Sequence, residues 1–95
     1  MPAYLIAEVD VTEPAAYEDY RKQVPPIIAK YGGRYLVRGG KVEGKEGSWT
    51  PPRFVIVEFP TMEQARQFYD SPDYAPVLAI RKKASRSRLI LAEGL

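Results

Sequence analysis

The stretch Tyr31-Gly32-Gly33-Arg34-Tyr35-Leu36-Val37-Arg38-Gly39-Gly40 decides the fold of this chain. It is a short strand-like run with a glycine pair on either side, and glycine accepts the left-handed backbone conformation that is common just beyond a helix C-terminus. We therefore expect a helix to end at Gly32-Gly33 and a strand to run from Arg34 to Arg38. Regular alternation along that strand would place both arginines on one face, away from Tyr35 and Val37.

Upstream of this stretch, the sequence predicts a strand and then a helix. Mostly apolar residues alternate between two faces from Ala3 to Val11, which is typical of a strand. Thr12-Glu13-Pro14 supplies a cap-type residue and a proline suited to the first helical turn, and apolar side chains then recur at helical spacing as far as Tyr31. Pro25-Pro26 removes backbone hydrogen bonds inside that helix, so we expect a kink or two short helices in series.

Downstream, the sequence predicts a long loop, two helices and two strands. Residues 39–52 form a loop that is long for a hairpin and contains the only tryptophan. Arg53 to Phe59 is the most β-prone run, and the capping-box pattern from Thr61 to Gln64 begins a helix. Ser71-Pro72 begins a second short helix, with the serine as cap and the proline at the first helical position, and Arg88 to Glu93 forms the last strand.

The resulting order, β-α-β-β-α-β, predicts an α+β fold: a ferredoxin-like domain over residues 1–95 with a four-stranded antiparallel sheet. Both helical segments would cover one face of that sheet. The open face would then be apolar, because it would carry Tyr4, Ile6, Phe54 and Ile56. A second copy of the chain is the simplest cover for such a face, so we expect a homodimer through the open sheet face.

Composition excludes several kinds of chemistry. The 95 residues contain no cysteine and no histidine, which removes thiolate nucleophiles, Ser-His pairs, the usual zinc sites and the common haem ligands. We therefore expect no cofactor and no metal. The net charge of +2 and the lack of aromatic residues among the basic ones argue against nucleic acid. No apolar run approaches the length of a membrane span and no signal peptide is recognisable, so the expected location is the cytoplasm.

Charged residues on the open face form a first candidate site. Glu8 and Glu58 would lie on the two central strands, and Arg38 or Arg34 could neutralise them. Two carboxylates beside an arginine in an apolar cleft are typical of an acid-base or polar-ligand site. The alternative is a structural salt bridge near the rim of the sheet.

Three other positions, Ser71, Tyr74 and Trp49, also have two interpretations. The hydroxyl groups of Ser71 and Tyr74 could meet a ligand at a helix N-terminus, or they could belong to a helix cap and the core. Trp49 could cover a ligand or contact a partner subunit, or it could cap the local core. Tyr20 is the helix tyrosine most suited to turn its hydroxyl into a cavity, and Arg81 is the basic residue that could point inward.

Several motifs together resemble the bacterial domain-of-unknown-function family DUF1330 over residues 4–94. They are the run 31–40, Gly47-Ser48-Trp49 with Pro52-Arg53, Val57-Glu58-Phe59-Pro60, and Ala65 with Phe68-Tyr69-Asp70-Ser71-Pro72-Asp73-Tyr74. The resemblance implies a dimeric α+β barrel, in which two ferredoxin-like subunits press their open sheet faces together. It implies little about activity, because relatives in the wider superfamily include cofactor-independent monooxygenases, isomerases, stress-responsive proteins and haem-dependent enzymes.

The sequence thus favours a homodimeric small-molecule-binding protein. One form of this function is a cofactor-independent enzyme acting on a small organic acid or aromatic metabolite, and whether a reaction is catalysed is left open. The expected pocket lies between sheet and helices, and its ligand-binding residues are Arg38, Trp49, Glu58, Ser71 and Tyr74. Glu58 and Arg38 are the best catalytic candidates. The alternative is a non-catalytic structural or regulatory dimer.

Overall fold

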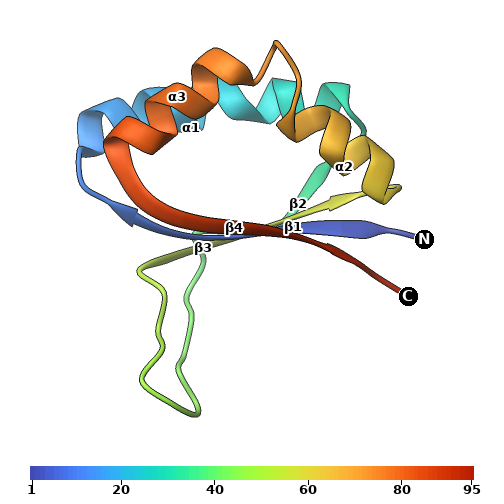
Figure 1. The fold of residues 1–95 in the computed structure, drawn as a ribbon. Coiled ribbons are helices and arrows are strands. Elements are labelled where there is room, and N and C mark those ends of the chain that lie inside the picture. Colours follow the sequence, from blue (N-terminus) through green and yellow to red (C-terminus); the bar gives the residue numbers. More distant parts are fainter.

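The computed structural model describes residues 1–95 as a four-stranded antiparallel sheet with three helices on one face (Figure 1). The predicted ferredoxin-like order is confirmed, and the strands lie in the order β2-β3-β1-β4. The elements are β1 (Ala3–Val11), α1 (Pro14–Lys30), β2 (Arg34–Arg38), β3 (Arg53–Phe59), α2 (Met62–Tyr69), α3 (Ala75–Ala84) and β4 (Ser85–Glu93). No helix is long and apolar enough to cross a membrane.

The core lies between the sheet and the helices. Leu5, Ala7 and Val9 of β1 are buried there, and Leu5 is in register with Val57 of β3 and with Leu91 of β4. The helices contribute aromatic and branched side chains from their inner stripes, so burial of apolar surface holds the two layers together. The assignment of the two faces of β1 from its alternation is confirmed.

A β-bulge in β2 changes the faces of its side chains. Tyr35 is in register with Val57, but the next paired residue is Val37, opposite Ile56, and Arg38 is then opposite Val55. Because side chains alternate along a strand, the extra residue returns Arg38 to the helix-covered face. Arg34 remains on the open face. The prediction that the two arginines share a face is therefore wrong, since it assumed regular alternation.

Helix α1 continues through Pro25-Pro26 as a single element, so the second of the two expected alternatives, a kink or two short helices, is not found. Proline at position 25 has no N–H to donate to the carbonyl of Arg21, four residues earlier. The guanidinium of Arg38 donates to that oxygen instead, at 2.8 Å. The side chain from β2 therefore satisfies an acceptor that Pro25 leaves free. At the helix end, Gly32 adopts the expected positive φ of 83°.

Two boundaries near the C-terminus differ from the prediction. Helix α3 begins at Ala75 rather than Pro72, because residues 71–74 form a capped turn before it. Strand β4 begins at Ser85 rather than Arg88, because residues 85–87 pair with the end of β1. This polar Ser-Arg-Ser segment adopts the extended conformation because it pairs with β1, and the local sequence does not reveal that pairing.

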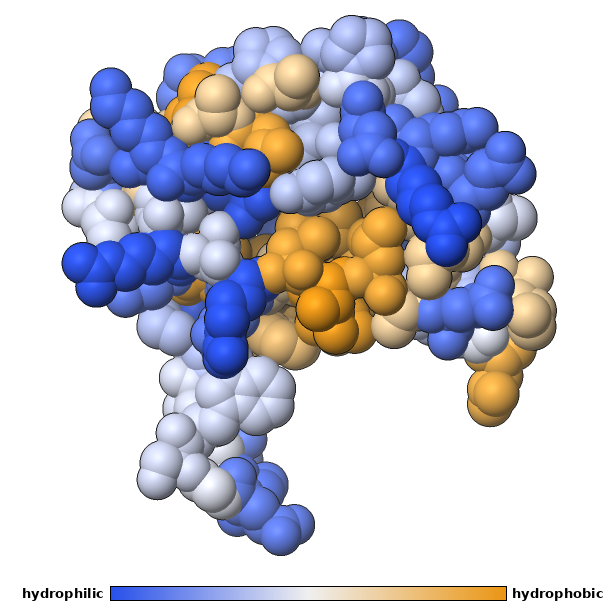
Figure 2. Space-filling model, viewed as in Figure 1, coloured by the Kyte–Doolittle hydropathy of each residue, from blue (hydrophilic) through white to orange (hydrophobic).

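The loop between β2 and β3 extends from the open side of the sheet, away from the helices (Figure 1). Its residues from 40 to 52 form no helix or strand. The space-filling view shows apolar surface at the near edge of the sheet, where β4 lies, with hydrophilic groups on both sides (Figure 2). Ile90 of β4 is one of the exposed large apolar residues. The open side of the sheet is thus the side on which apolar residues lack a cover.

Candidate ligand site between the sheet and the helices

A small cavity lies between the helix-covered face of the sheet and the helices. Its walls are mostly apolar, and its free volume is about 30 Å³, enough for a water-sized group. Five aromatic side chains line it: Tyr17, Tyr20, Tyr35, Phe68 and Tyr74. Four arginines line it too, and no aspartate or glutamate does. The cavity therefore combines aromatic walls with cationic groups.

Two arginines tie the sheet to helix α1 at the outer end of the cavity. Arg38 is exposed; its guanidinium carbon lies 4.7 Å from the ring centre of Tyr35, and it reaches the carbonyl of Arg21. Arg53, on the neighbouring strand, donates from Nε to the hydroxyl of Tyr17 at 3.1 Å. Burial raises the pKa of Tyr35 to about 12, although nearby Arg38 acts in the opposite direction. We call Tyr35, Arg38, Arg53 and Tyr17 the mouth of the cavity.

Two tyrosines meet at the inner end. The hydroxyl groups of Tyr20 and Tyr74 are 2.7 Å apart and form a buried hydrogen bond. Burial, followed by the proximity of Tyr74, raises the pKa of Tyr20, so its phenol stays neutral. The ring of Tyr74 is fixed by Phe68, whose centre is 4.4 Å away. The predicted inward orientation of the Tyr20 hydroxyl is confirmed.

Arg81 of α3 completes this inner end. Arg81 is 4% exposed, so the prediction that it points inward is confirmed. Nη1 donates to the hydroxyl of Ser87, while Nε has no hydrogen-bond partner among the protein atoms. The two phenols, Tyr20 and Tyr74, are close enough to influence its guanidinium electrostatically. A buried cation with an unused N–H donor thus lies beside two neutral hydroxyl groups.

The predicted carboxylates lie on the opposite, open face. Glu8 accepts hydrogen bonds from Nε1 of Trp49 and, at 3.0 Å, from Nε of Arg88. These contacts, Trp49 first and Arg88 after it, hold the pKa of Glu8 below its usual value despite some desolvation. Trp49 also meets the ring of Phe54 edge-on, at 6.4 Å. Trp49 therefore holds the loop against the open face and does not cap the helix-side core.

Glu58 pairs with Arg34, not with Arg38. Nε of Arg34 lies 2.8 Å from Oε1 of Glu58, and the arginine side chain is 74% exposed. This contact has the geometry of a structural salt bridge at the surface, which was the alternative to an acid-base or polar-ligand site. The bulge explains why Arg38 is absent from it. The expected single pocket is therefore divided by the sheet: Arg38 and Tyr74 line the cavity, whereas Glu58 and Trp49 lie on the other face.

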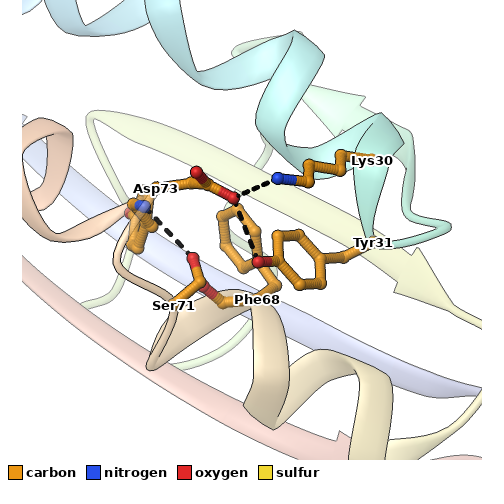
Figure 3. Close-up of polar contacts among 6 residues, drawn as sticks. Lys30, Tyr31, Phe68, Ser71 and Asp73 are labelled. Atoms are coloured by element: carbon orange, nitrogen blue, oxygen red, sulfur yellow. Dashed lines mark hydrogen bonds and ion pairs between the residues drawn. The ribbon is translucent and has the colours of Figure 1, made fainter.

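The turn at Ser71 forms a cap (Figure 3). The Ser71 hydroxyl donates to the carbonyl of Phe68 at 2.8 Å and accepts from the backbone N–H of Tyr74 at 3.1 Å. Asp73 accepts from Lys30 at 2.6 Å and from Tyr31 at 3.1 Å, and these two contacts lower its pKa. Ser71 does not line the cavity. It acts on the cavity only by fixing the backbone of Tyr74.

Of the residues that line the cavity, the sequence-based candidate site included Arg38 and Tyr74, and those absent from it include Arg21, Tyr35, Arg53 and Arg81. Arg81 had a usable signal, because it lies on the inner stripe of a helix one turn after Val77, where an apolar residue is normal. The other three gave no comparable signal. Their roles depend on the register of β2 with β3 and on the position of α1 over the sheet.

Comparisons with known structures agree with this architecture. The protein of unknown function RPA0582 from Rhodopseudomonas palustris superposes with a TM-score of 0.76 at 19% identity, covering 99% of this chain and 82% of its own. SnoaB, a cofactor-independent oxygenase from Streptomyces nogalater, gives 0.68 at 14% identity, covering 99% and 93%. A putative antibiotic biosynthesis monooxygenase from Nitrosomonas europaea gives 0.63 at 15% identity, covering 100% and 99%. Identities this low show a shared fold and nothing more.

The architecture therefore defines the fold class, a ferredoxin-like α+β domain, as the sequence predicted. Within that class, the model of the domain of unknown function DUF1330 matches residues 2–95. The chain belongs to the DUF1330 family. None of the curated proteins matches the sequence.

Proposed function

We propose that this chain is a homodimeric small-molecule-binding protein whose site is the cavity between the sheet and the helices. Its ligand is a small organic acid or an aromatic metabolite. The observation that carries the proposal is the composition of the cavity: apolar and aromatic walls with a few polar groups directed inward, as in most ligand sites. Arg38 and Tyr74 belong to this site, and Glu58, Trp49 and Ser71 support the fold around it.

The mouth would control entry. The free volume of about 30 Å³ is far below the 300–1,000 Å³ of typical ligand sites, so an aromatic ligand enters only if side chains at the mouth move. Arg38 is suited to such a movement, because it is exposed and is held by one hydrogen bond and the ring of Tyr35. After entry, it would close over the ligand between β2 and α1.

Chemistry on a bound ligand would depend on the inner end of the cavity. The groups there that can transfer a proton are the phenols of Tyr20 and Tyr74, and Arg81 could stabilise a developing anion. SnoaB, which shares the fold, is a cofactor-independent oxygenase. The proposal for this chain is binding, with any catalysis using these three groups in place of the predicted pair Glu58 and Arg38.

The small volume of the cavity favours a second candidate, a non-catalytic structural or regulatory dimer. In that case the mouth arginines would only connect the sheet to α1. The two functions differ in one measurable respect, since only the first requires a ligand to stabilise the protein.

A thermal-shift screen of small aromatic and carboxylic compounds tests the first function. We expect at least one compound to raise the melting temperature of the wild type, and Arg38→Ala to weaken its binding because the mouth no longer closes. Glu58→Gln is the matched control: it removes a charge on the other face and should leave binding unchanged. Binding that is indifferent to Arg38→Ala, or no binding by any compound, would favour the non-catalytic dimer.

The dimer would form through the open face. Ile6 and Ile56 are in register on its two central strands, with Phe54 and Ile90 close by, so their apolar surface needs a cover. The same face of a second copy is self-complementary under two-fold symmetry. Sedimentation at micromolar concentration should show a dimer, and a monomer would contradict this part of the proposal.

A further inference from the structure

The inner end of the cavity contains a cation without an anion. Arg81 is 96% buried, and its guanidinium remains protonated at any physiological pH. Each of the six ion pairs in the structure lies elsewhere. Of the four arginines that line the cavity, only Arg21 has a carboxylate partner, Glu18 on its own helix. The cavity as a whole is therefore positively charged.

Packing alone does not account for Arg81. A buried charge without a partner destabilises the folded state, and an apolar side chain of similar volume at such a position is often neutral or stabilising. Val77 and Ala84 occupy the other buried positions of the same helix. Ser87 satisfies one guanidinium nitrogen, but Nε is left without a protein acceptor. The residue is thus poorly explained as part of the core.

The neighbouring hydroxyl groups are arranged to assist an anion. Tyr20 and Tyr74 share one hydrogen bond, which uses one of their two O–H protons. The second proton can be donated to another acceptor in the cavity. Arginine binds carboxylates through two parallel N–H donors, and the free Nε–H supplies one of them. The free volume of about 30 Å³ already holds a water-sized group, so small shifts of the lining side chains would admit one such head group.

We infer that Arg81, with the hydroxyl pair of Tyr20 and Tyr74, is the binding site for the anionic group of the ligand, a carboxylate or a group of the same shape and charge. The inference rests on the proposed function and fixes the orientation of the ligand. The charged end enters first and contacts Arg81. The apolar remainder lies against Tyr35 and Phe68 and is covered by Arg38.

Formate tests this site, because it is a bare carboxylate and needs the least movement of the mouth. Chloride is exchanged for formate at constant ionic strength, and the melting temperature is measured; formamide, which is neutral and similar in shape, serves as the second probe. We expect formate to raise the melting temperature of the wild type by several degrees and formamide to have no effect. The formate shift should vanish in Arg81→Met and persist in Arg86→Met, an exposed arginine on β4.

The variants separate a binding role from a structural one. Without formate, Arg81→Met should be at least as stable as the wild type, because it removes an uncompensated buried charge. If Arg81→Met does not fold, Arg81→Lys replaces it: the ammonium lacks the planar pair of donors, so the formate shift should shrink. A shift that is unchanged in whichever variant is measured overturns the inference.

The outcome also distinguishes this inference from the proposed function. No formate shift in the wild type, together with stabilisation by neutral aromatic compounds, overturns the anion site and leaves the ligand cavity in place. Equal stabilisation by formate and formamide has the same meaning. A formate shift without any response to larger compounds supports the anion site and counts against binding of an aromatic metabolite.

Discussion

The arginines on the two faces of the sheet have different kinds of partners. On the open face, Arg34 contacts Glu58 and Arg88 contacts Glu8, so each charge meets an opposite one. On the helix-covered face, the arginines that line the cavity mostly donate to neutral groups, and Arg81 has an unused N–H as well. A surface charge that has an opposite charge as its partner needs no further explanation. An unpaired charge in an apolar layer indicates a ligand, and this difference distinguishes arginines that stabilise the fold from those that form the site.

The largest expected effect comes from two separate substitutions in β3, each of which places a new carboxylate on a different face of the sheet. Val57 is 1% exposed and faces the helices, so Val57→Asp should remove most of the folding stability: an unpaired buried charge costs several kcal/mol out of a typical 5–15 kcal/mol. Ile56→Asp, on the open face, should keep the native circular dichroism spectrum but sediment as a monomer. A dimer in Ile56→Asp would show that the open face is not the contact between subunits.

A medium effect is expected at the buried hydroxyl pair. Tyr20→Phe or Tyr74→Phe leaves one hydroxyl without its 2.7 Å partner, which should lower the free energy of unfolding by about 1–3 kcal/mol. The double variant leaves neither hydroxyl behind, so its loss should be smaller than the sum of the two single losses. Urea unfolding of the four proteins measures this coupling. Additive losses would mean that the two hydroxyl groups do not depend on each other.

A smaller effect is expected from the titration of Tyr35 at the mouth. Burial raises its pKa in the folded protein from 10.0 to about 12, so the unfolded chain loses this proton first. The stabilisation is therefore complete below pH 10 and is lost as the pH rises towards 12. Tyr20 shifts in the same direction. Urea unfolding over this range should show falling stability, with a shallower slope in Tyr35→Phe; equal slopes would place the Tyr35 phenol in water.

The smallest effect is expected for the pair on the open face. Arg34→Met breaks the contact with Glu58. The side chain of Arg34 is 74% exposed, so the free energy of unfolding should change by less than about 1 kcal/mol. Added salt should reduce the difference further. Chemical denaturation at low and high salt measures it. A loss of several kcal/mol would show that this pair stabilises the fold more than its exposure predicts.

Sequence patterns predicted the fold because they are local. Alternation in β1, the helix start at Thr61, where the hydroxyl accepts the N–H of Gln64, and the positive φ of Gly32 are all confirmed. Of the two alternatives for Pro25-Pro26, two short helices in series was wrong: α1 is continuous there, and Arg38, a side chain from another element, donates to the carbonyl that Pro25 leaves free. The extension of β4 was missed because its first residues are extended by pairing with β1.

The candidate site was predicted only in part. Tyr74 and Arg38 were chosen and do line the cavity, but Arg38 was expected opposite a carboxylate and lies opposite Val55. Nothing in the run Tyr35-Leu36-Val37 marks a bulge, because bulges depend on the pairing of two strands. Glu58 was chosen because an arginine was expected beside it, whereas Trp49 was chosen because the loop that contains it is long. Arg81 could have been included on its position alone, as a charge on the inner stripe of a helix.

The bulge in β2 has a consequence for how relatives of this chain are compared. Removing the single codon for Leu36 would take out the extra residue, and Tyr35, Val37 and Arg38 would stay opposite Val57, Ile56 and Val55 in regular alternation. Two genes that differ by three bases would then place the same arginine in the same cavity, although its position counted along the strand differs by one. Sequences related to this one should therefore be aligned by the register of β2 with β3, since counting residues along β2 does not establish a matching site.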